Sequence, residues 1–97
     1  MRYAVKFDFD TDASIRSGTK VLIYSDMMKA AGMFNTLSLA YALAKPVKVK
    51  GGSINILGSW LYEVEVNDDA SAEARVKAGD ALLVDFAPEM AVNIDEL

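Results

Sequence analysis

The sequence predicts an α+β fold: a mainly antiparallel sheet of about five to six strands, with one long and one short helix packed on one face. Three observations lead to this prediction. Segments of alternating apolar and polar residues recur, the stretch at 26–44 has a helical pattern, and short turns join the middle segments. The 97 residues form one domain, 1–97, and suffice for one hydrophobic core.

Alternation indicates two half-buried strands. Residues 2–9 place four aromatic or branched side chains on one side, and residues 60–66 repeat the pattern. We expect both sets to share one buried face of the sheet. The eight side chains are Tyr3, Val5, Phe7, Phe9, Trp60, Tyr62, Val64 and Val66.

Turn residues delimit the remaining strands. Gly51-Gly52 tolerates the positive φ that a two-residue turn needs, and therefore indicates a β-hairpin. Gly58-Ser59 indicates a second turn. The additional strands are expected at 20–25, on either side of the turn within 46–57, and at 81–86.

The long helix is predicted over 26–44. Ser25 or Asp26 can cap its first turn by accepting a free backbone N–H, and Pro46 prevents continuation. At 100° per residue, seven side chains fall on one arc that we expect to face the core. They are Met27, Ala30, Met33, Phe34, Leu37, Tyr41 and Ala44.

The opposite side of this helix is also apolar. Met28, Leu39 and Leu43 align there, where a surface helix would carry charges. Two explanations remain open: another element such as the 88–96 tail covers this side, or a second subunit or partner does. We favour a protein contact, and assign these three residues to it.

The short helix is predicted over 67–79, with Asp68 or Asp69 as its N-cap. Residues 51–97 carry 10 acidic and 2 basic side chains, whereas residues 1–50 carry 8 basic and 4 acidic ones. Asp68, Asp69 and Glu73 could therefore imitate phosphates and contact a nucleic-acid-binding partner. The simpler interpretation is that the two halves interleave in the fold, so that their charges mix.

The amino-acid composition of the chain excludes most types of catalytic chemistry. The chain has no cysteine and no histidine, and thus lacks the usual nucleophiles, neutral proton shuttles and transition-metal ligands. Asp8, Asp10 and Asp12 are spaced like the start of a calcium loop, but Ala13 and Thr19 stand where such a loop needs Gly and Glu. We expect no enzyme activity, no cofactor and no metal site.

Direct nucleic-acid binding is not expected either. The basic and aromatic group formed by Lys45, Lys48, Lys50, Trp60 and Tyr62 offers charge and stacking surfaces. However, the chain has a net charge of −4 and a pI of about 4.6, which disfavour a phosphate backbone.

These observations predict a non-catalytic protein that binds another protein. Its most concrete form is a small acidic inhibitor that occludes a partner's surface, similar to the anti-CRISPR proteins that viruses and mobile elements encode. The partner could be a nucleic-acid-binding complex. The alternative is a small structural or assembly subunit that forms homo-oligomers, and an enzyme using carboxylates ranks third. Without a signal peptide or an apolar run of about 18 residues, we expect a cytoplasmic protein with no membrane contact.

Overall fold

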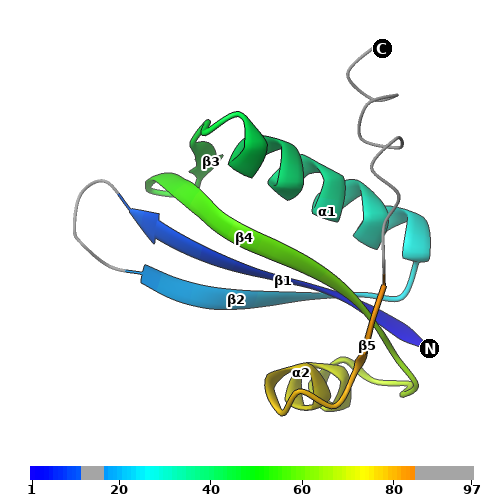
Figure 1. The fold of residues 1–97 in the computed structure, drawn as a ribbon. Helices are drawn as coiled ribbons and strands as arrows, with labels where there is room; N and C mark the ends of the chain where they lie inside the picture. The colour runs from blue at the N-terminus through cyan, green and yellow to red at the C-terminus, as the bar shows by residue number, and fades with distance from the viewer. Residues whose placement is uncertain (12–16, 85–97) are drawn as a thin grey trace.

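The structure of the protein is a computed structural model that describes residues 1–11 and 17–84. Five strands and two helices lie within these ranges (Figure 1). In chain order they are β1 (Arg2–Thr11), β2 (Ser17–Tyr24), α1 (Met27–Ala42), β3 (Val47–Val49), β4 (Gly52–Val64), α2 (Asp69–Lys77) and β5 (Leu82–Leu83).

The strands form one sheet in the order β2-β1-β4-β3, and every neighbouring pair is antiparallel. Strand β5 pairs with the other end of β4. Strand β1 is central: Val5 lies opposite Leu22 of β2 and Leu61 of β4. The predicted α+β class with a mostly antiparallel sheet is therefore confirmed.

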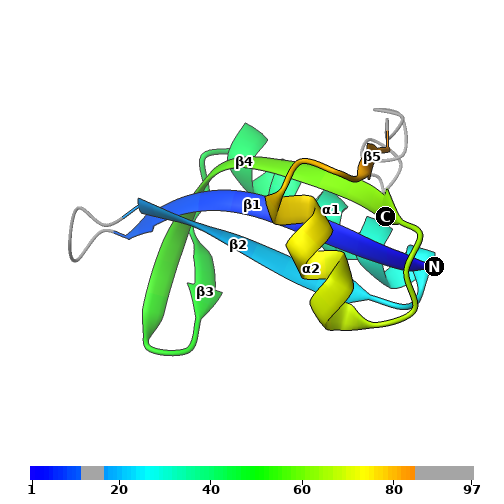
Figure 2. The ribbon, with the colours of Figure 1, turned by 90° about the horizontal axis from the view of Figure 1, so that it is seen from below.

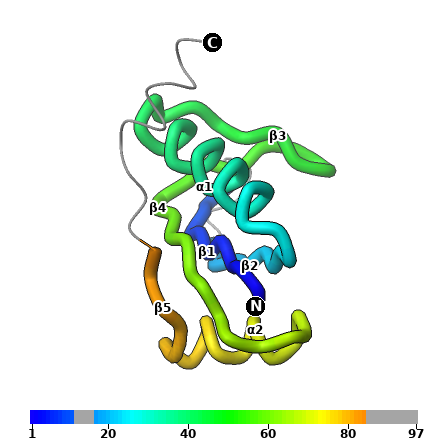
Figure 3. Tube along the Cα trace, turned by 90° about the vertical axis from the view of Figure 1, so that its right-hand side faces the viewer, coloured from blue at the N-terminus to red at the C-terminus, as the bar shows by residue number. Residues whose placement is uncertain are grey.

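The two helices cover opposite faces of the sheet, not one face as the sequence analysis expected (Figures 1 and 3). Successive residues of a strand point to opposite faces. In β1, Val5 packs with α1 and the neighbouring Ala4 packs with α2, and both are fully buried. The sheet is thus the middle of three layers.

Each face has its own core. The cluster under α1 is larger, with buried residues Val5, Phe7, Ala30, Leu37, Ile56 and Leu61. The cluster under α2 has the buried residues Ala4, Val64, Ala72 and Val76. Small alanines on both sides of the second cluster let the short helix approach the sheet closely. Seen from below, α2 lies across β1 and β2, while the β3–β4 hairpin projects from the other end of the sheet (Figure 2).

The expectation that Trp60 shares a face with Val5 is wrong. Trp60 lies opposite Lys6, whose Nζ is 5.4 Å from the centroid of the indole ring, on the α2 side of the sheet. Leu61 is the β4 residue that packs with Val5. Because both faces are covered, apolar side chains occupy both sides of β4, and alternation alone could not show which set meets which helix.

Strand β4 runs unbroken from Gly52 to Val64, so the turn expected at Gly58-Ser59 does not exist. Gly58 has a packing role instead. A Cβ placed there would lie 2.9 Å from the Trp60 ring, so any larger residue would force the indole to move. The predicted hairpin turn at Gly51 is present, with φ at 90°.

Helix α1 begins where predicted, since the Asp26 side chain accepts a 2.8 Å hydrogen bond from the Met28 amide. Ala30 and Leu37 are buried as expected. Tyr41, however, is 57% exposed, and the neighbouring Ala42 at the end of the helix is exposed as well. The predicted tail helix at 88–96 lies outside the described residues. None of the described helices has the length and apolar character that a membrane crossing requires.

The α1 core should tolerate truncation at Leu61 poorly. Leu61→Ala removes a fully buried side chain and should lower the free energy of unfolding by about 2–5 kcal/mol, measured by urea denaturation. Leu57→Ala is the matched control in the same strand; Leu57 is 47% exposed, so its truncation should cost about 0.5 kcal/mol or less. Equal losses in the two variants would contradict the assignment of Leu61 to the core.

Candidate functional site

The outer side of α1 presents the apolar side chains that the sequence analysis selected. We call Met28, Leu39 and Leu43 the outer strip. Met28 is 76% exposed, Leu43 is 53% exposed, and Leu39 is half-buried. A hollow of about 310 Å³ runs along this side of the helix. Its described lining is Gly32, Asn35, Thr36, Leu39, Ala40, Leu43 and Lys45.

The backbone at the middle of the outer strip is accessible. A Cβ built on Gly32 would meet no atom within 4 Å, so another surface could come close to the helix there. The nearby Thr36 hydroxyl donates a 3.0 Å hydrogen bond to the Gly32 carbonyl. Because this hydroxyl is satisfied within its own helix, covering it would cost little desolvation.

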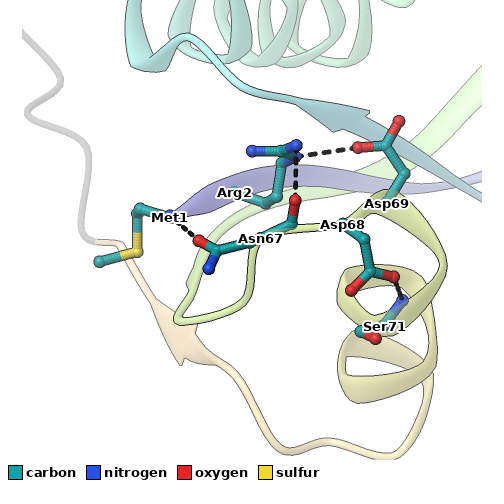
Figure 4. A network of polar contacts seen from close by, with 6 residues as sticks. All are labelled: Met1, Arg2, Asn67, Asp68, Asp69 and Ser71. Carbon is teal, nitrogen blue, oxygen red and sulfur yellow. Dashed lines mark hydrogen bonds and ion pairs between the residues drawn. The ribbon is translucent and has the colours of Figure 1, made fainter.

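The three predicted acidic residues each make a contact within the chain. Asp68 is the N-cap of α2 and accepts a 2.8 Å hydrogen bond from the Ser71 amide (Figure 4). Hydrogen bonds from Ser71 lower the pKa of the Asp68 carboxyl below its usual value. Glu73 pairs with Lys77 at 3.4 Å, one turn along the helix.

Asp69 joins the start of β1 to the start of α2. The Nε of Arg2 donates to the Asp69 carboxylate at 3.0 Å, and its second guanidinium nitrogen donates to the Asn67 carbonyl at 2.7 Å. The N-terminal ammonium of Met1 donates to the Asn67 side-chain oxygen at 3.4 Å. Figure 4 shows this network between the start of β1 and the segment leading into α2. These contacts give the carboxylates a local structural role.

The structure does not bring the two predicted contact groups together. The outer strip is on α1, whereas Asp68, Asp69 and Glu73 are on or next to α2, across the sheet (Figure 1). The two groups therefore do not form one continuous surface.

The first two aspartates of the 8–12 stretch are engaged as hydrogen-bond acceptors. Asp8 accepts from the Thr19 hydroxyl at 2.7 Å, and Asp10 accepts from the Asn55 amide at 2.9 Å. Asp12 lies outside the described residues. In residues 1–11 and 17–84, no group of three or more His, Cys, Asp or Glu side chains is placed to hold a metal ion.

One feature that the sequence analysis missed is an apolar groove between α1 and the sheet, of about 520 Å³. Three lysines line it, Lys20 of β2 with Lys48 and Lys50 of the β3–β4 hairpin. The sequence analysis grouped Lys48 and Lys50 with Trp60, which lies on the other face of the sheet. Lys20 could have been found from its position two residues before Leu22, which puts both side chains on the α1 face.

No protein-family description, curated protein or solved structure matches this chain in sequence or fold comparisons.

The N-cap predicts a specific acid dependence of stability. The folded pKa of Asp68 is lowered, so its stabilising contribution is complete above its unfolded pKa of about 3.9 and is lost as the pH falls through the lower folded value. Asp68→Asn keeps a capping oxygen and should have nearly the wild-type melting temperature at pH 7, but a smaller decrease between pH 5 and pH 2. Thermal unfolding followed by circular dichroism measures both.

Asp68→Ala is the control for capping itself, since it removes both the charge and the oxygen. It should lower the melting temperature at pH 7 more than Asp68→Asn does. If Asp68→Asn shows the full wild-type decrease in acid, the ionised Asp68 carboxylate does not stabilise α2.

Proposed function

We propose that this is a non-catalytic protein that works by binding another protein through the outer strip of α1. The observation that carries the proposal is the exposure of Met28 and Leu43 on a helix whose opposite side is buried in the core. Large apolar side chains gathered on one exposed surface are typical of contact sites. The flexible thioether of Met28 suits a surface that must fit a partner.

The size of the strip is sufficient for a specific contact. Complete burial of one such side chain contributes about 1.5–3 kcal/mol, so the three together can offset the cost of association at micromolar affinity. The accessible backbone at Gly32 supports close packing of a partner helix or loop in the middle of the strip.

The most concrete form of this function is a small inhibitor that occludes the surface of a partner, similar to an anti-CRISPR protein. The short acidic chain and its lack of histidine and cysteine support this form. Self-association is the second candidate. It is favoured by the position of Gly32 between Met28 and Thr36, because two copies of α1 could cross closely there.

Charge introduced into the strip should abolish association without unfolding the protein. We expect Leu43→Glu, and Met28→Glu separately, to keep the wild-type circular dichroism spectrum and melting temperature. If the wild-type chain is a dimer by sedimentation velocity, both variants should be monomers, because a carboxylate cannot be buried unpaired at the contact. A wild-type monomer would remove the self-association candidate.

Leu57→Glu is the matched control, since Leu57 is 47% exposed and lies on β4 away from the strip. It should leave the sedimentation coefficient unchanged. If Leu43→Glu or Met28→Glu unfolds the chain, the strip is part of the core and the proposed function loses its basis.

The inhibitor form predicts a cellular effect with the same dependence. In cells that carry a sensitive CRISPR defence system, expression of the wild-type chain should let a targeted phage replicate. The plating efficiency of the phage should rise at least tenfold over cells without the chain. Expression of Leu43→Glu should abolish this protection of the phage, and Leu57→Glu should retain it. If no effector type in a representative panel responds to the wild-type chain, the anti-CRISPR form is wrong.

A further inference from the structure

The interior of the groove under α1 is apolar. Its lining residues come from α1, from β1 and β2, and from the β3–β4 hairpin. Figure 3 shows this hairpin on the α1 side of the β1–β2 pair. Phe7 and Leu37 line it and are buried members of the main core, while Phe9, Leu22 and Met33 pack against that core. The groove is therefore an extension of the core space to the surface.

The polar part of the groove has one sign of charge. Lys20, Lys48 and Lys50 are among its lining residues, and all three are exposed. No carboxylate is among the described residues that line it. The chain as a whole has a net charge of −4, so this local group of three cations distinguishes this end of the molecule from the rest.

We propose that this groove binds a small amphipathic anion, a single alkyl chain ending in a carboxylate, independently of the outer strip. The alkyl chain enters between Phe7 and Leu37, and its carboxylate stays at the mouth beside the lysines. The groove volume of about 520 Å³ falls within the range of small-molecule sites, about 300–1,000 Å³. An apolar groove that is joined to the core suits a flexible chain better than a folded partner surface.

Calorimetric titration with a series of alkyl carboxylates, below their micelle concentrations, tests the apolar part. Affinity should rise about fourfold for each added methylene from hexanoate to decanoate, which is the expected gain from burying a CH₂ group. Decyltrimethylammonium, which has the same tail with a cationic head, should bind at least tenfold more weakly than decanoate. Equal affinity for the two head groups would overturn the proposal.

Lysine variants test the charged part. Lys20→Glu and Lys48→Glu should each weaken decanoate binding by about fivefold, as expected for an exposed charge contact. Lys29→Glu is the matched control, because Lys29 is an exposed α1 lysine that does not line the groove. A loss with Lys29→Glu as large as with Lys20→Glu would mean that net charge alone controls binding.

Amide chemical shifts locate the site. Decanoate should shift the resonances of Phe9, Leu22 and Met33, and leave those of α2 unchanged. Leu43→Glu should bind decanoate normally, so a failure of the proposed protein contact does not affect this test. If decanoate does not bind but an acidic, leucine-containing peptide does, with the same lysine dependence, the groove is a peptide site and the proposal is wrong.

Discussion

The structure depends on one constraint, the burial of both faces of the central strand β1. Ala4 and Val5 are adjacent, point to opposite sides of the sheet and are both fully buried. A helix must therefore cover each face, and three layers form in a chain of only 97 residues. The small side chains of Ala4 and Ala72 make the second layer thin, which allows a nine-residue helix to complete it.

The elements themselves could largely be predicted because their signals are local. The alternation of 2–9, the Gly51-Gly52 turn, and the caps at Asp26 and Asp68 depend only on neighbouring residues. The pairing of faces could not be predicted in this way. Whether Trp60 or Leu61 meets α1 depends on the register with β1 and on a helix lying on each side.

The glycines show the same limit. Gly58 and Gly51 are the same residue type in different settings. Gly58 lies within a strand next to an indole ring, whereas Gly51 lies in a turn with positive φ. Only the position of Trp60, set by the fold, separates the two cases.

The candidate sites follow this rule as well. Helical periodicity placed Met28 and Leu43 on the side of α1 opposite the core, but it left open whether the chain covers them. The lysine-lined groove needs the hairpin to lie beside α1 and was not visible in the sequence.

The uneven charge along the sequence does not divide the molecule into an acidic and a basic face, since β1 from the first half pairs with β4 from the second. Arg2 and Asp69 even form an ion pair across the halves. Charge is instead separated along β4. The groove lies near Ile54, whereas Glu63 is nine residues further along the strand, about 30 Å at 3.3 Å per residue.

That separation is several times the Debye length of about 8 Å at physiological ionic strength, so Glu63 repels an anion at the groove only weakly. The nearer carboxylates Asp8 and Asp10 accept hydrogen bonds from Thr19 and Asn55 and, by strand alternation, lie on the sheet face opposite the groove. Among the described residues, these three carboxylates therefore lie away from the groove lysines. An acidic protein can in this way keep a local site for an anionic ligand while the rest of its surface repels nonspecific anions.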